Sequence, residues 1–246
     1  MKLIALQSGH ENITSNCNSG LRKSTGAPGE IEFTIKIRNR LSQILLSKKT
    51  SGGAQAFSIQ LMDANYNCFP VSKTTNFDFF LAIHYEADTH NKGGGFITAP
   101  DPDYDDNNKE SIRIVNCIKS EYFKHSGIEE HEEWITNAMT EYYMWSALSL
   151  KTACGIIECG VGQDPHDKVL LNDTDRISNA IARGICKAFN IDFDAPIKSV
   201  DIFELHNKKI KELIEKLENV TIEKDDLKAK LLISNQKIEN VKRDIA

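Results

Sequence analysis

The sequence predicts an α/β fold, in which helices flank a twisted, mostly parallel central sheet and a long C-terminal coiled-coil helix follows. Short apolar runs alternate with amphipathic stretches up to residue 191, as in strands joined by crossover helices. One run, 77–84 (FDFFLAIH), is apolar enough to indicate a central strand covered on both faces. After Pro196 the pattern becomes a heptad repeat. We therefore expect a catalytic domain over 1–195 and a helix over 196–246.

Each element has its own local signal. Strands are expected at 2–7 (KLIALQ), 56–62 (AFSIQLM), 77–84, 93–100 (GGGFITAP) and 153–158 (ACGIIE). A helix beginning at Glu30 has an apolar stripe formed by Phe33, Ile37, Leu41, Ile44 and Leu45. A second helix is expected to end near Lys124, and a third is expected within 173–191 behind a capping Asp or Thr. The aromatic-rich segment 132–150 matches no regular pattern and is interpreted as a local insertion.

The C-terminal segment carries a sustained coiled-coil signal. Ten of its thirteen a and d positions are apolar, and Lys and Glu fill the outside. These positions are Phe203, His206, Ile210, Leu213, Leu217, Val220, Lys224, Leu227, Leu231, Ser234, Ile238, Val241 and Ile245. We expect homo-oligomers through this helix. The alternatives are an amphipathic helix folded back on the domain and a stalk to a further module.

Composition excludes several classes of protein. Of 246 residues, 40% are hydrophobic and 26% charged, as in ordinary globular proteins. The net charge of -5 and the lack of a basic face argue against a nucleic-acid partner, and no apolar run is long enough to cross a membrane. The N-terminus MKLIALQSGH resembles a buried strand more than a signal peptide. Six scattered cysteines without a CxxC pair indicate reduced thiols in a protein made in the cytoplasm.

Three residues are candidates for a metal site because of where they fall. His10 follows the first strand, His84 ends the central strand, and Glu30 opens the first helix. The carboxyl ends of parallel strands share one edge of the sheet, so these side chains can meet there. Two histidines and one carboxylate, with a position left for water, form a known ligand set for catalytic zinc.

Glu158 is the candidate catalytic group. It ends the last predicted strand and precedes a turn-prone stretch, CGVGQDPHD. A carboxylate at that position, close to a metal, can act as general base on water.

Structural roles remain open for all four residues. A strand-end histidine is often a hydrogen-bonded structural residue, and a glutamate at a helix start can simply favour the helix dipole. Glu158 could pair with a buried Lys or Arg. Other histidines could compete for the metal, namely His90, His125, His131, His166 and His206.

Four stretches, in order, resemble the motifs of zinc-dependent N-acetylmuramoyl-L-alanine amidases of the amidase 3 type, and among these a phage endolysin catalytic domain. They are IALQSGH, with its strand and Gly-His pair; TGAPGEIEFTIKI, with a turn and a helix-opening Glu; FFLAIH; and GIIECG, with its Glu-x-Gly ending. The resemblance covers about 1–192. It implies that His10, Glu30 and His84 bind zinc and that Glu158 is the catalytic carboxylate.

The chain departs from the family pattern in two places. Glu32 competes with Glu30 as second ligand, and we prefer Glu30 because the family's apolar positions then fall on apolar residues, namely Phe33, Ile35, Ile37 and Leu41. After His84 the chain reads HYEAD, where the family often has Asn two residues past the histidine. The contacts of the substrate loop are therefore expected to differ.

The resemblance implies a hydrolase that cleaves the amide between N-acetylmuramic acid and L-alanine in peptidoglycan. It also implies synthesis in the bacterial cytoplasm without a signal peptide, and action on the cell wall after release through a separate pore-forming protein. A mother-cell lytic amidase of a spore former would have a similar sequence. The competing functions are another zinc peptidoglycan hydrolase, such as a stem-peptide peptidase, and a non-catalytic coiled-coil assembly protein.

Overall fold

The computed structural model describes residues 1–11, 26–64, 73–87, 92–104 and 107–195. Met1–Ala195 forms one compact unit. The predicted coiled-coil helix over 196–246 lies outside the described residues, so it stays a prediction. Within the described part of the chain, no helix combines the length and apolar character needed to cross a membrane.

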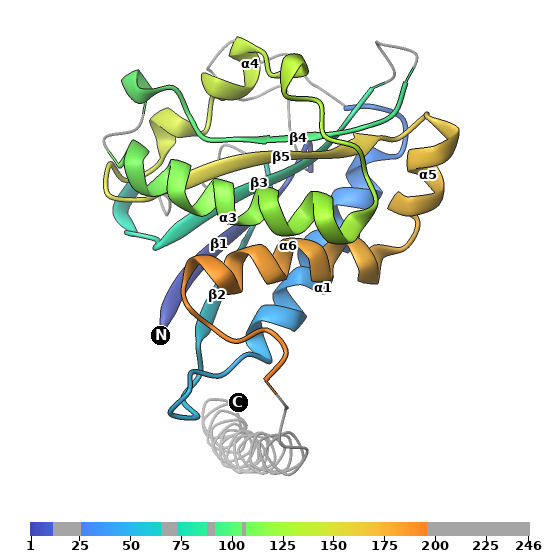
Figure 1. Cartoon of the computed structure of the whole chain (residues 1–246). Coiled ribbons are helices and arrows are strands. Elements are labelled where there is room, and N and C mark those ends of the chain that lie inside the picture. The colour runs from blue at the N-terminus through green and yellow to red at the C-terminus, as the bar shows by residue number, and fades with distance from the viewer. Residues whose placement is uncertain (12–25, 65–72, 88–91, 105–106, 196–246) are drawn as a thin grey trace, which may run out of the picture. The chain divides into compact units, whose positions relative to one another are not determined.

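A five-stranded sheet in the order β2-β1-β3-β5-β4 forms the centre of this unit (Figure 1). The strands are β1 (Lys2–Ser8), β2 (Phe57–Met62), β3 (Phe79–Glu86), β4 (Phe96–Thr98) and β5 (Cys154–Val161). The first three and β5 are parallel, whereas the short edge strand β4 pairs antiparallel with β5. The predicted α/β class with a mostly parallel sheet is confirmed.

The central position of β3 follows from its composition. Seven of its eight residues are buried, because β1 and β5 flank it and both faces are covered. Side chains alternate along a strand, so Phe80, Ala82 and His84 share one face while the residues between them share the other. A histidine at the end of this strand is thereby placed at the carboxyl edge of the sheet.

Three long helices cover the face opposite to His84 (Figure 1). They are α1 (Glu30–Leu46), α3 (Asn108–Ser126) and α6 (Thr174–Ala188). All five residues of the predicted α1 stripe are buried in the main core, together with strand residues such as Ile4, Leu6 and Leu81. The N-cap of α6 is Asp173, whose side chain accepts a hydrogen bond from the Arg176 N–H, as its local sequence predicts.

The second face is covered by the segment that the sequence left unassigned. It contains the short helix α4 (Asn137–Thr140) and two 3-10 turns, η3 (Glu132–Trp134) and η4 (Trp145–Ala147). Trp145, Met144 and Leu148 pack against Phe80 and other strand residues to form a second core. This face is therefore closed by an irregular aromatic segment, not by a long helix.

Two other short elements were not predicted. A 3-10 turn, η2, spans Pro102–Tyr104, and a helix, α5, spans Pro165–Leu171. The Asp164 side chain caps α5 by accepting hydrogen bonds from the N–H groups of His166 and Asp167, and proline occupies the first turn. Asp164 followed by Pro165 is a recognisable signal for the start of a helix. The pair lies, however, within a stretch that the sequence analysis interpreted as a turn.

Gly184 allows α3 and α6 to pack closely. A Cβ atom at this position would lie 2.3 Å from the Ile118 Cα and 3.0 Å from the Cys117 carbonyl oxygen. Because these are backbone atoms of α3, a side chain can fit only if the helices move apart. We expect Gly184→Ala to lower the free energy of unfolding by about 1–3 kcal/mol, seen as a lower Tm in thermal denaturation of the full chain followed by circular dichroism.

Gly52 provides the matched control. A Cβ atom there would meet nothing closer than the Thr50 Oγ1, at 3.9 Å. Gly52→Ala is therefore expected to change stability by less than about 0.5 kcal/mol. Equal Tm values for the two variants would contradict the close helix contact.

Candidate active site

Three of the four sequence-predicted site residues meet at the carboxyl edge of the sheet. His10 lies two residues beyond β1, His84 lies near the end of β3, and Glu30 is the first residue of α1. One nitrogen of each histidine and one oxygen of Glu30 lie within 4.8 Å of one another. Residues separated by 20 and 54 positions thus form a candidate metal-binding triad.

One carboxylate oxygen joins the triad. The Glu30 Oε1 lies 2.9 Å from the His84 Nδ1 and 3.3 Å from the His10 Nε2. The two imidazole rings stand nearly perpendicular, with centroids 5.0 Å apart. The other ring nitrogens, His10 Nδ1 and His84 Nε2, are buried without a hydrogen-bond partner among the described residues. Two imidazoles and a carboxylate converging in this way suit a divalent cation.

Two glycines make the triad sterically possible. A Cβ atom at Gly9 would lie 2.5 Å from the His84 Nδ1, and one at Gly26 would lie 2.3 Å from the Glu30 Oε2. The Gly9 N–H continues the sheet by donating to the Ile83 carbonyl oxygen at 2.8 Å. The chain then turns at His10, which has a positive φ of 59°. The Ser-Gly-His sequence after β1 thus brings one histidine against another.

The start of α1 fixes the Glu30 side chain. Its Oε2 accepts a hydrogen bond from the Ala27 N–H at 2.8 Å, while its Oε1 faces both histidines. The N-cap is Gly29, with a φ of 86°. Burial raises the pKa of the Glu30 carboxyl, but hydrogen bonds and charge from His10 and His84 outweigh burial and lower this pKa to about 2. Glu30 is therefore held as an anion.

Arg38 holds the loop that carries His10. Its Nη1 donates to the Ser8 Oγ at 2.7 Å and to the Met62 carbonyl oxygen at 2.9 Å, and it also pairs with the Glu11 carboxylate. Arg38 is buried on α1, so the helix that supplies Glu30 also anchors both sides of His10. The sequence analysis missed this residue, although an arginine next to the apolar stripe was the available signal.

Glu158 lies beside the triad on the neighbouring strand. It is paired in register with His84 across β3 and β5, and alternation along parallel strands places both side chains on the same face. The Glu158 Oε2 is buried and has no hydrogen-bond partner among the described residues. No described Lys or Arg forms an ion pair with it, which argues against the structural alternative considered for this residue.

The surroundings of Glu158 favour its protonated form. Burial raises the pKa of its carboxyl well above the ordinary value, and the negative charges of Glu30 and Glu86 raise it further. A carboxyl group in such an environment can hold a proton and release it when a positive charge approaches.

Tyr142 covers the triad from the irregular segment. Its ring lies edge-on to the His84 ring, with centroids 5.6 Å apart. Its hydroxyl donates to the Gln7 Oε1 at 3.1 Å, and the Gln7 Nε2 donates to the Asp63 carbonyl oxygen at the same distance. This contact was not predicted, because nothing local in the sequence indicates where an irregular segment packs.

The remaining described histidines lie outside the triad. His125 pairs with Glu121 on α3, and His131 stacks on Trp134. His166 is exposed; it forms a second candidate group with Asp164 and Asp167. Both aspartates already accept hydrogen bonds from backbone N–H groups. His90 and His206 lie outside the described residues.

Asp167 organises the chain around the end of β5. Its Oδ2 accepts hydrogen bonds from the N–H groups of Gly94 and Val161. The side chain is buried, and a Cβ atom at Gly93 would lie 2.6 Å from its Oδ1. The glycine run before β4 thus packs against α5, the helix that follows Glu158 and the end of β5 in the sequence.

No family model and no curated protein sequence matches the chain. Solved structures do match it, and several of them are N-acetylmuramoyl-L-alanine amidases. The enzyme Ami1 from Mycobacterium smegmatis aligns with a TM-score of 0.58 and 14% identity, covering 77% of this chain and 97% of that one. The CwlD amidase from Clostridioides difficile, in complex with the GerS lipoprotein, aligns with a TM-score of 0.55 and 16% identity, covering 77% and 99%.

An endolysin domain also matches. The catalytic domain of the CD27L endolysin, which targets Clostridia difficile, aligns with a TM-score of 0.52 and 11% identity, covering 76% of this chain and 98% of that domain. At such low identities the agreement concerns the fold. The described unit of this chain has the fold of the two amidases named above over almost their full length.

Proposed function

We propose that the protein is a zinc-dependent hydrolase that cleaves the amide between N-acetylmuramic acid and L-alanine in peptidoglycan. The observation that carries the proposal is the meeting of His10, Glu30 and His84 beside Glu158. The shared fold supports it, since several of the matched proteins are named for this reaction.

The spacing of the donor atoms suits zinc. Ligand atoms at about 2.0–2.2 Å from a tetrahedral zinc ion lie roughly 3.3 Å from one another. The distances from the Glu30 Oε1 to the His84 Nδ1 and the His10 Nε2, 2.9 and 3.3 Å, are close to that value. We propose His10, Glu30 and His84 as the ligands. Glu32, the alternative, is exposed on α1.

Zinc in this position would polarise the scissile carbonyl and lower the pKa of water toward about 7. Glu158 accepts a proton at its carboxylate as the water oxygen bonds to the carbonyl carbon. It then returns the proton to the alanine nitrogen as the carbon-nitrogen bond breaks. The products are a free lactyl carboxylate on the glycan and a peptide with a free L-alanine amine.

Tyr142 and Glu30 have positioning roles in the proposed mechanism and take no part in proton transfer. The Tyr142 ring packs edge-on to His84, a contact that would restrict rotation of the imidazole. The second oxygen of Glu30 is bound to the Ala27 N–H, so the first oxygen keeps one orientation. Such fixed groups lower the cost of arranging the reacting atoms.

Product analysis tests the bond that is cut. Digestion of purified cell walls is expected to release peptides that begin with a free L-alanine amine, identified by mass spectrometry. Glu158→Gln is expected to retain zinc and to lose activity by roughly 10²–10⁴-fold, because the amide cannot transfer the proton. Fragments that keep L-alanine on the muramic acid would instead indicate a stem-peptide peptidase.

Glu129→Gln is the matched control for that variant, because Glu129 is largely exposed and is remote in sequence from the four site residues. It should digest walls at the wild-type rate. Full lytic activity of Glu158→Gln would overturn the role given to Glu158. Wild-type activity that persists after zinc removal by a chelator would overturn the metal mechanism.

Metal content tests the ligands. His84→Ala is expected to lower the affinity for zinc by at least about 100-fold, since a buried ligand has a larger effect than its supporting residues. Elemental analysis after dialysis measures the bound zinc. His125→Ala removes an imidazole of α3 that, among the described residues, pairs with Glu121, and it should leave the zinc content unchanged. Equal zinc in both variants would exclude His84.

The C-terminal segment 196–246 bears on the oligomeric state of the protein. We propose that the heptad pattern over 196–246 joins catalytic units into a homo-oligomer, which raises their effective concentration on a wall surface. Sedimentation of the full chain should then give a multiple of the monomer mass, and a 1–195 truncation should sediment as a monomer. Identical monomeric masses for both would refute oligomerisation through this segment.

A further inference from the structure

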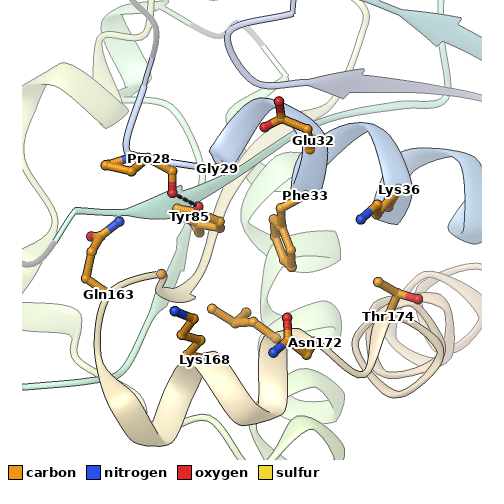
Figure 2. Close-up of a pocket in the computed structure, with 12 residues that line it drawn as sticks. Pro28, Gly29, Glu32, Phe33, Lys36, Tyr85, Gln163, Lys168, Asn172 and Thr174 are labelled. Atoms are coloured by element: carbon orange, nitrogen blue, oxygen red, sulfur yellow. Dashed lines mark hydrogen bonds between the residues drawn. The ribbon is translucent and has the colours of Figure 1, made fainter.

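A pocket lies at the start of α1, on the helical side of the sheet (Figure 2). Its volume of about 440 Å³ is within the range of roughly 300–1,000 Å³ for small-ligand sites. The first turns of α1, the end of β3, α5 and the first residue of α6 form its walls. None of its lining residues belongs to the triad.

The pocket nevertheless begins next to the triad. Gly29 lines it, and the following residue is Glu30. Tyr85 also lines it, follows His84 in β3, and donates its backbone N–H to the Glu30 Oε1 at 3.4 Å. The pocket and the triad thus adjoin at the first turn of α1 and at the end of β3.

Two lysines give the pocket a positive character. Lys36 reaches it from α1 and Lys168 from α5, on either side of Phe33 (Figure 2). Both are exposed, and neither side chain has an ion pair or hydrogen bond with another described residue. Glu32 is the one acid among the described residues that line the pocket. Positive charge therefore exceeds negative charge among the described residues of the pocket wall. Both ammonium groups are available to bind a ligand.

The base of the pocket is apolar. The rings of Phe33 and Tyr85 pack with centroids 5.0 Å apart, and the Tyr85 hydroxyl donates to the Pro28 carbonyl oxygen. Leu171 adds an aliphatic surface from α5. An apolar base between two cations suits a short peptide that carries small side chains and a carboxylate.

We propose that this pocket binds the peptide of the substrate, on the leaving side of the scissile amide, through a free peptide carboxylate held by Lys36 and Lys168. The inference rests on the proposed function. Next to the scissile bond the glycan side is neutral, because its lactyl carboxyl is part of the amide. The attached peptide retains free carboxylates, with which ammonium groups form charge-assisted hydrogen bonds.

Paired substrates test the charge recognition. The full-length zinc-loaded protein is given muramyl tripeptides whose peptide carboxylates are either free or converted to primary amides. We expect wild type to prefer the free acids in kcat/KM. Lys36→Gln and Lys168→Gln should each reduce this preference by roughly two- to fivefold, and the double variant by roughly tenfold, as expected for solvent-exposed charge pairs.

Lys151→Gln is the matched control. Lys151 is exposed, lies before the amino end of β5, and its side chain also has no partner among the described residues. The Lys151→Gln substitution removes the same positive charge, but at the other edge of the sheet. If the double variant keeps the wild-type preference as Lys151→Gln does, the proposed peptide subsite is wrong even though the amidase activity stands.

Binding of the tripeptide alone separates the two proposals. Without glycan and without added metal, calorimetry should detect binding to wild type that weakens with salt and is reduced in the double variant. If wild type cleaves neither muramyl peptide but shows this lysine-dependent binding, the proposed reaction fails and the subsite stands. Competition by a peptide-free muramyl glycan would overturn the assignment to the peptide.

Discussion

The structure of the site depends on a single carboxylate oxygen, the Glu30 Oε1, which lies within 3.3 Å of imidazole nitrogens of both His10 and His84. These side chains come from a helix start, a post-strand turn and a central strand. Each needs its own support. Glycines supply the space, the Ala27 N–H fixes the other carboxylate oxygen, and Arg38 holds the turn. The carboxyl edge of a parallel sheet is where such distant segments meet.

The two faces of the sheet contribute differently to the candidate active site. On one face, long helices pack on β3 and give α1 a fixed position, so the direction of Glu30 is set by the main core. On the other face, His84 and Glu158 lie beneath a segment with only short helical turns. A regular helix would present a repeating stripe of side chains, whereas the irregular segment can bring one aromatic ring, Tyr142, against His84. The helical face thus fixes the position of Glu30, and the irregular segment on the other face packs an aromatic ring against His84.

How much of this was predictable depends on how local each signal is. The apolar run of β3 and the Asp173 cap of α6 are local, and the structure has them where the sequence predicts. The meeting of His10 with Glu30 is not local: the positions at a strand end and a helix start only made it possible, and the family resemblance supported it more firmly. Arg38 and Tyr142 escaped prediction because their roles depend on which distant backbone or ring they touch. The α5 helix was missed despite a local cap, since glycines around it favoured a turn.

The electrostatics of Glu30 and Glu158 would link the proposed metal binding to the proposed catalysis. Glu30 is held as an anion by its histidines, and its negative charge contributes to the raised pKa of the Glu158 carboxyl. Without a cation, two ionised carboxylates so close together would repel each other in a buried setting. A divalent cation held by the triad would reverse that balance, since it neutralises Glu30 and stabilises ionised Glu158. The carboxyl would then become a base only where the metal is present. A buried carboxyl at the end of β5 is compatible with a stable fold because its protonated form carries no charge to desolvate.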